Sequence, residues 1–234
     1  MGQEATAAEY DEILAAADAY NVPVEQSFYY PLLLRVVAEV RARKLQSVLE
    51  VGCGTGGLAQ LLMRETSATY HGFDFSSFAV RAAATRTRRR DSFFQGDALD
   101  PQSYRFTYDG IACTEVLEHI KRDLDVVRLW KSGTHCICTV PNFDDPTHVR
   151  YFRNEREVFG RYGHLIDIAS IVRVPKPLFI GKTLRQYLRQ VRWARESPTQ
   201  MLGLLGVNKF DWHGGWFVFC GLRRRTPQYL HAVE

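Results

Sequence analysis

The chain has 234 residues, of which 46% are hydrophobic and 24% charged, and its formal net charge is +4. These values are typical of one globular α/β domain with a substantial core. No run of about 18 apolar residues occurs, which excludes a membrane-spanning helix. The opening MGQEATAAEYDE lacks the basic start and apolar run of a secretory signal.

The mildly basic charge is unevenly distributed, with arginines gathered at 86–90, 185–195 and 223–225. An anionic partner is compatible with these clusters, but solvated helix ends and a basic tail account for them more simply. A nucleic-acid partner is therefore disfavoured but stays open.

Cysteine usage indicates the compartment. The five cysteines are an odd number spread through apolar stretches, which favours buried thiols in a cytoplasmic protein over a disulfide framework. No second cysteine pair or histidine-rich partner accompanies Cys136 and Cys138, so no metal site is predicted there.

Residues 1–44 are predicted to contain two helices. Tyr10, Ile13 and Leu14 recur at helical spacing in an alanine-rich stretch over 7–19, and Pro31 begins a second apolar helix.

From residue 47 onward, short apolar runs alternate with helical segments. This rhythm predicts a mostly parallel sheet with helices on both faces. The expected strands are 47–51, 69–73, 92–95, 108–113, 135–140, 166–174 and 216–222, and the expected helices are 57–65, 78–87, 122–131 and 155–162.

Residues 175–213 interrupt this rhythm with prolines and a basic helical stretch. Alone, they could hardly bury a core. We interpret them as an insertion that forms a substrate lid, within a single domain that spans residues 1–234.

The strongest local signal is VLEVGCGTGG, in which an apolar strand runs into a glycine-rich turn and then a helix. Gly52, Gly54 and Gly56 permit a tight turn and close approach of a ligand to the backbone. The helix that follows offers free amides. The same letters also fit a dinucleotide fingerprint, and Asp74 at the end of the next strand suits a ribose in either case.

Three further features separate the two interpretations. Glu50 lies inside the first strand, where a charge needs a partner such as a ligand ammonium. The third strand ends at Asp97 and Ala98, beside the same edge of the sheet. The fourth strand leads into CTEVLEHI, residues 113–120.

With these motifs, residues 45–165 resemble the class I S-adenosylmethionine-dependent methyltransferase family. The resemblance implies a Rossmann-like sheet of order 3-2-1-4-5-7-6 whose last strand is antiparallel. It implies that the turn lines the methionine part of the cofactor, that Asp74 accepts hydrogen bonds from the ribose hydroxyls, and that Asp97 meets the adenine amine. The N-terminal helices are expected to close over this cleft. The full cofactor set is Glu50, Gly52, Gly54, Gly56, Asp74, Phe75, Asp97, Ala98, Thr114 and Glu115.

The expected catalytic residues follow the fourth and fifth strands. On a helix, Glu115, Glu118 and His119 would share a face, and a histidine can remove the proton of an acceptor hydroxyl. The loop over 139–152 adds His148, Arg150 and Tyr151 as possible substrate contacts. We predict O-methylation of a small molecule, with His119, His148 and Glu118 as catalytic residues and without a metal.

Two alternatives remain open at this point. Metal-dependent RNA 2′-O-methyltransferases use a Glu-x-x-Glu-His arrangement and a later histidine, here His148 or His164. Quinone-pathway O-methyltransferases share E-x-L-E-H as well. A non-catalytic scaffold that binds S-adenosylmethionine is the other alternative. DNA amino-methyltransferases are disfavoured, because no Asn/Asp-Pro-Pro-aromatic motif follows the fourth strand.

Overall fold

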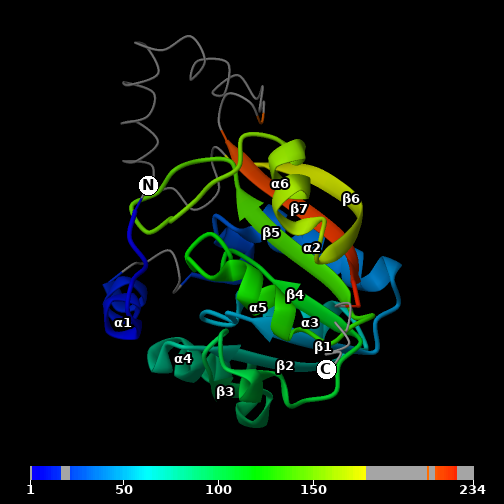
Figure 1. Cartoon of the computed structure of the whole chain (residues 1–234). Helices are drawn as coiled ribbons and strands as arrows, with labels where there is room; N and C mark the ends of the chain where they lie inside the picture. The colour runs from blue at the N-terminus through cyan, green and yellow to red at the C-terminus, as the bar shows by residue number, and fades with distance from the viewer. Residues whose placement is uncertain (1, 17–21, 178–209, 211–213, 226–234) are drawn as a thin grey trace, which may run out of the picture.

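Seven strands form one sheet in the computed structural model, which describes residues 2–16, 22–177, 210 and 214–225 (Figure 1). The strand order is β3-β2-β1-β4-β5-β7-β6, and β7 runs antiparallel to both β5 and β6. The predicted order and the antiparallel last strand are therefore confirmed. The strands are β1 Ser47–Val51, β2 Thr69–Asp74, β3 Phe93–Gln95, β4 Gly110–Cys113, β5 His135–Pro141, β6 Ile166–Pro175 and β7 Gly215–Arg223.

The predicted helices form with small shifts at their ends. The helix expected over 122–131 is shorter, because it ends at Leu129 and its carbonyls are taken up by the buried Arg223 guanidinium. The helices are α1 Ala7–Ala16, α2 Tyr30–Ala42, α3 Gly57–Glu65, α4 Ser77–Thr87, α5 Asp123–Leu129 and α6 Glu155–Tyr162. Single turns of 3₁₀ helix lie at Val24–Gln26, Arg90–Ser92 and Pro101–Tyr104.

Two apolar cores lie on opposite faces of the sheet. Because side chains alternate along a strand, Val48 of β1 joins the core formed with α2, α3 and α4, whereas Leu49 and Val51 join the core formed with α5 and α6. Burial on both faces explains why the central strands are continuous apolar runs.

The order of the strands fixes where a ligand can bind. β1 and β4 are neighbours in the sheet although β2 and β3 intervene in sequence. In such a sheet, the loops after the strands open into a crevice at this switch point. The glycine-rich turn after β1 and the segment after β4 therefore meet at one edge (Figure 1).

Further predictions from the sequence concern the cysteines, the helix lengths and the insertion. All five cysteines are free and buried, as expected. Among the described residues, no helix is both long and apolar enough to cross a membrane. The insertion predicted at 175–213 lies almost entirely outside the described residues, as do residues 17–19 of the first predicted helix.

Candidate functional site

A cavity of about 700 Å³ opens at the carboxyl ends of β1, β2, β3 and β4. This volume lies within the range of small-molecule sites. Nine of the ten predicted cofactor residues line it, as do two of the three predicted catalytic residues. Those lining residues are Glu50, Gly52, Gly54, Asp74, Phe75, Asp97, Ala98, Thr114 and Glu115, with His119 and His148.

The glycine-rich turn is held by Asp74 at the end of β2. One carboxylate oxygen of Asp74 accepts a hydrogen bond from the Gly54 amide at 2.9 Å, and the other accepts from the Ser76 amide at 2.9 Å. Burial raises the pKa of Asp74, while these amide hydrogen bonds oppose the rise. Asp74 thus links the turn after β1 to the turn after β2.

The glycines of this turn have different roles although all three have positive φ. Gly54, at φ 50°, faces open space, because a Cβ built there would meet no atom within 4 Å. Gly56, at φ 80°, lies outside the cavity lining, and a Cβ there would lie 2.9 Å from the backbone of Ala83 in α4. Gly54 therefore leaves room for a ligand, and Gly56 allows α3 and α4 to pack closely.

Substitution by alanine can distinguish the roles of these two glycines. Gly54→Ala is expected to lower the affinity for S-adenosylhomocysteine at least tenfold, because the methyl group enters ligand space. Because alanine is disfavoured in the left-handed backbone conformation, Gly54→Ala should lower the free energy of unfolding by only about 1–2 kcal/mol. Gly56→Ala carries the same strain and adds overpacking of about 1–3 kcal/mol. Calorimetric binding and thermal unfolding of both variants check this, and equal melting temperatures would contradict it.

Glu50 is buried, and its partner in the protein is Tyr70. The Tyr70 hydroxyl donates a hydrogen bond to Glu50, and a side chain at Gly72 would collide with that hydroxyl. Burial raises the pKa of Glu50 to about 8. The sequence predicted that Glu50 needs a partner but did not indicate Tyr70. The available signal was that Glu50 of β1 and Tyr70 and Gly72 of the adjacent β2 lie on the same face of the sheet.

This pKa predicts a proton linked to ligand binding. Near pH 7 Glu50 is mostly protonated, and a cationic ammonium beside it would lower its pKa, so binding should release close to one proton. Affinity should then rise with pH up to about 8 and level off above it. Calorimetry in two buffers of different ionisation enthalpy measures this release, and Glu50→Gln should abolish it. Equal proton release by wild type and Glu50→Gln would exclude Glu50 as the source.

The third acid and its neighbours border the same cavity. Asp97 is exposed, and its carboxylate accepts a hydrogen bond from the Leu99 amide at 2.8 Å. Ala98 is buried beside it. Phe75 packs against Tyr10 of α1 with ring centroids 5.1 Å apart. This geometry is compatible with the predicted adenine end, whose residue roles stay predictions.

α1 covers part of the cavity. Tyr10 also meets the His119 ring edge-to-face, with centroids 5.7 Å apart. Asp11 accepts hydrogen bonds from the hydroxyls of Ser76 and Ser77 at the start of α4. Ahead of the helix, the Gly2 amide donates to the His148 carbonyl at 2.7 Å. The described N-terminal residues are thus tied to both sides of the cavity.

The segment after β4 differs from the prediction. Residues 114–122 form turns, and Glu115 has φ 56°, so Glu115, Glu118 and His119 do not share a helix face. Glu115 accepts hydrogen bonds from the Thr139 hydroxyl at 3.0 Å and from the Trp216 indole at 2.6 Å. These contacts hold a backbone conformation that is uncommon for a non-glycine residue.

His119 and His148 lie together, with ring centroids 4.9 Å apart. Nδ1 of His119 is 3.0 Å from the Thr147 carbonyl oxygen, and Nδ1 of His148 is 3.3 Å from that of Phe143. Because a carbonyl only accepts, both Nδ1 atoms carry a proton and both Nε2 atoms keep a lone pair. Burial lowers the pKa of His119 to about 4 and also lowers the pKa of His148.

Glu118 completes this group from behind the cavity lining. It is fully buried, its carboxyl group donates a hydrogen bond to that of Glu115, and Oε1 lies 3.9 Å from Nε2 of His119. Burial and the nearby charge of Glu115 raise the pKa of Glu118. One potential ligand atom each from Glu118, His119 and His148 lies within 4.8 Å of the others. His164 is not a member of this group.

Arg150 does not point at a substrate position. Its guanidinium donates to the carbonyls of Leu117, Ile120 and Lys121. The sequence indicated the loop that carries Arg150 but not this contact, which needs the non-helical turn after β4.

The chain is similar to known methyltransferases in sequence and in structure. A family profile described as "Methyltransferase domain" matches residues 25–195. The ubiquinone biosynthesis O-methyltransferase of Vibrio parahaemolyticus is 34% identical over 122 residues, covering 48% of this chain and 51% of that protein. The Escherichia coli protein of the same name is 36% identical over 106 residues, 42% of each chain. The chain thus spans about half the length of the curated relatives it matches.

Two solved structures illustrate the similarity of fold. The Haloferax volcanii methyltransferase in complex with the Trm112 methyltransferase activator aligns with a TM-score of 0.62 at 17% identity, covering 93% of this chain and 98% of that one. A Geobacter sulfurreducens SAM-dependent methyltransferase in complex with S-adenosylhomocysteine aligns with a TM-score of 0.55 at 16% identity, covering 82% and 91%. At these identities the likeness concerns the fold alone.

Proposed function

The chain belongs to the class I methyltransferase family, and we propose that it transfers a methyl group from S-adenosylmethionine to a hydroxyl oxygen of a small, largely apolar acceptor. The observation that carries this proposal is the pair His119 and His148, whose Nδ1 atoms are committed to carbonyls and whose Nε2 lone pairs are free for acceptor chemistry. Both rings line the cavity that the glycine-rich turn enters.

The residues present fit S-adenosylmethionine. Gly54 offers open space, and Glu50 is a buried carboxyl next to which a cation would be favourable. Asp74 has further lone pairs for ribose hydroxyls, and the buried Thr114 hydroxyl in the lining makes no hydrogen bond within the protein. The assignment of individual residues to parts of the cofactor is our proposal.

The acceptor is proposed from the lining near the histidines and from relatives. Phe143 contacts His148, and Phe28 and Tyr29 join Phe143 through Trp216, which gives that part of the cavity an aromatic surface. Val24 and Leu33 extend the apolar lining beside Gly57. Such surfaces favour planar apolar molecules with few polar groups. The two relatives described above are named as O-methyltransferases of ubiquinone biosynthesis, which supports oxygen as the accepting atom.

The chain's own groups supply positioning and a proton acceptor. When bound, S-adenosylmethionine provides an electrophilic methyl group on its sulfonium sulfur. The aromatic lining orients the acceptor for in-line attack. Nε2 of His119 accepts the hydroxyl proton as negative charge develops on the oxygen, and its Nδ1–H bond to Thr147 keeps the ring in the required tautomer. Oε1 of Glu118 lies 3.9 Å from Nε2, beyond hydrogen-bonding distance, so Glu118 is proposed to act on the imidazole electrostatically and not to take the proton directly.

Methyl transfer can be tested directly with radiolabelled S-adenosylmethionine and a panel of catechols, phenols, amines and RNA. We expect label in O-methylated catechols or phenols. Label confined to amines or to RNA would contradict the proposed acceptor class. Retained affinity for S-adenosylhomocysteine without transfer to any acceptor would favour the scaffold alternative instead.

A second candidate, metal-assisted O-methylation, is favoured by the group Glu118, His119 and His148. The buried Glu118 carboxyl group and two neutral imidazoles form a mixed oxygen and nitrogen set. Such a set suits Mn²⁺, Co²⁺ or Zn²⁺ better than Mg²⁺. Bound there, the ion would act as a Lewis acid on the acceptor oxygen. Glu115 is turned toward Thr139 and Trp216, so the Glu-x-x-Glu-His pattern is only partly assembled.

Chelation separates the two candidates. After exhaustive dialysis against EDTA, the metal-assisted version predicts lost transfer that Mn²⁺ restores, with Mn²⁺ binding abolished in Glu118→Gln. The metal-free version predicts unchanged transfer. His164→Ala serves as the matched control, because His164 is exposed and separate from the three residues.

The cellular setting is part of the proposal. Five free, buried cysteines support a reducing compartment, and we propose the cytoplasm. A small-molecule acceptor is the proposed partner.

A further inference from the structure

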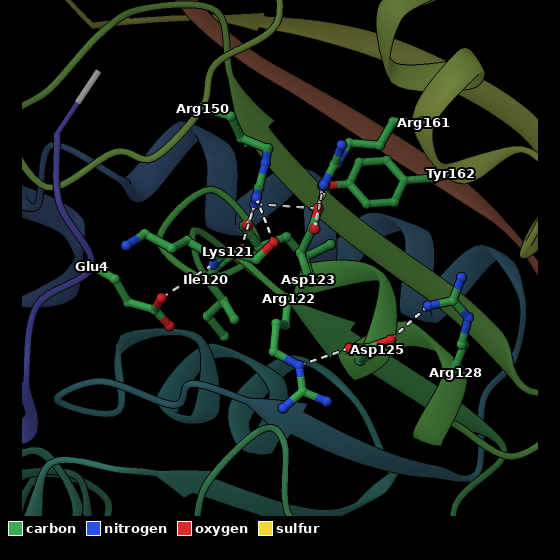
Figure 2. A network of polar contacts seen from close by, with 11 residues as sticks. Glu4, Ile120, Lys121, Arg122, Asp123, Asp125, Arg128, Arg150, Arg161 and Tyr162 are labelled. Carbon is green, nitrogen blue, oxygen red and sulfur yellow. Dashed lines mark hydrogen bonds and ion pairs between the residues drawn. The ribbon is translucent and has the colours of Figure 1, made fainter.

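The turn that carries Glu118 and His119 lacks the internal hydrogen bonds of a helix. Residues 114–122 do not form a helical ladder, so their carbonyls need other partners. Three of these carbonyls, of Leu117, Ile120 and Lys121, converge on the guanidinium of Arg150, two of them at 2.6 and 3.0 Å (Figure 2). Arg150 therefore donates the hydrogen bonds that the backbone amides of a helix would otherwise donate to these carbonyls.

A buried carboxylate fixes the guanidinium in turn. Asp123, fully buried at the start of α5, lies 3.3 Å from Arg150. The same carboxylate accepts two hydrogen bonds from Arg161, at 2.6 and 2.7 Å, and one from the Tyr162 hydroxyl at 2.8 Å (Figure 2). Since Arg161 and Tyr162 belong to α6, the position of Arg150 is set from a packed helix rather than from its own loop.

The backbone around Arg150 joins the same two segments. The Val149 amide donates to the Glu118 carbonyl at 2.9 Å, and Nδ1 of His119 donates to the Thr147 carbonyl at 3.0 Å. The segment 147–150 thus contacts the turn over 117–121 through backbone, imidazole and guanidinium together. These contacts hold the His119 ring against the ring of His148.

We propose that Arg150 is a positioning residue, which gathers three carbonyls of the turn after β4 so that His119 faces His148 in the cavity, with Glu118 behind them. This role rests on the proposed function insofar as the histidines serve methyl transfer. A lysine retains the charge, but its compact ammonium cannot span the three carbonyls and Asp123 as the planar five-donor guanidinium does. Replacement should therefore misplace the imidazoles without removing them.

The test compares Arg150→Lys with Arg223→Lys. Arg223 is a matched control, because its buried guanidinium also binds backbone carbonyls, those of Val127 and Arg128 at the other end of α5, away from the histidines. We expect both variants to lose thermal stability. Only Arg150→Lys should lower kcat by about tenfold or more, as misplacement near reacting groups does, while the affinity for S-adenosylhomocysteine stays within threefold.

Imidazole ¹⁵N resonances give a readout that does not depend on turnover. The signals of His119 and His148, assigned with His119→Gln and His148→Gln, should move in Arg150→Lys and stay in place in Arg223→Lys. Unmoved signals in Arg150→Lys would overturn the proposal. If the wild type transfers no methyl group to any acceptor, the proposed function fails while the resonances still decide the positioning role. Asp123→Asn should shift the same signals and provides a second variant if Arg150→Lys does not fold.

Discussion

His119→Ala is expected to lower kcat by about two to four orders of magnitude, which is the usual contribution of a positioned general base. The affinity for S-adenosylhomocysteine should change by less than threefold, because His119 contacts the acceptor side of the cavity. The loss of kcat is expected because Nδ1–H of His119 is donated to the Thr147 carbonyl, which leaves Nε2 as the proton acceptor. Steady-state kinetics and calorimetric binding on the same preparations measure both values.

The pH profile and a control sharpen this test. Because burial lowers the pKa of His119 to about 4, the ring stays neutral until the pH falls toward that value. We therefore expect kcat to be flat between about pH 6 and pH 8, where a histidine of ordinary pKa would lose activity on the acid side. His164→Ala should behave as wild type. A half-loss of kcat near pH 6.5 in the wild type, or full activity of His119→Ala, would rule out His119 as the base.

Asp74→Ala is expected to weaken S-adenosylhomocysteine binding by about 100-fold or more. The substitution removes a carboxylate that accepts two backbone amide hydrogen bonds and is proposed to accept from the ribose hydroxyls. Hydrogen bonds to a charged group contribute about 1.5–3 kcal/mol each, so losing the ribose contacts alone accounts for this factor. Asp74→Asn, which keeps one acceptor oxygen, should lie between Asp74→Ala and the wild type.

Asp167→Ala is the matched control for Asp74. Asp167 is an exposed acid on β6 that pairs with Arg224, far along the sheet from β1. Its removal should leave S-adenosylhomocysteine affinity unchanged. If Asp74→Ala, still folded by thermal melting, bound S-adenosylhomocysteine as tightly as Asp167→Ala does, the proposed cofactor site would be wrong.

Alternation along the chain was sufficient to predict the sheet. Apolar runs separated by helical segments gave the strands, and the resemblance of the glycine-rich turn to the class I family gave their order. Helix ends were less predictable, because tertiary contacts decide them. The last turn of α5, for example, ends where Arg223, 94 positions after Leu129 in sequence, takes up its carbonyls. No sequence pattern around residue 130 predicts that contact.

The site was predictable where it depends on strand ends and not where it depends on turns. Glu50, Asp74 and Asp97 could be placed because parallel strands end at one edge of a sheet. The turn after β4 could not be predicted, because the i and i+3 spacing of Glu115 and Glu118 suggested a helix. The structure instead has Glu115 at positive φ, held by Thr139 and Trp216, which lie 24 and 101 residues away.

The central claim is that the glycine-rich turn and the three acids bind S-adenosylmethionine. Calorimetric titration of the wild-type chain with S-adenosylhomocysteine tests it most directly, with NAD as the competing dinucleotide ligand. We expect saturable binding of S-adenosylhomocysteine and none of NAD. Binding of NAD, or no binding of S-adenosylhomocysteine by the folded chain, would contradict it.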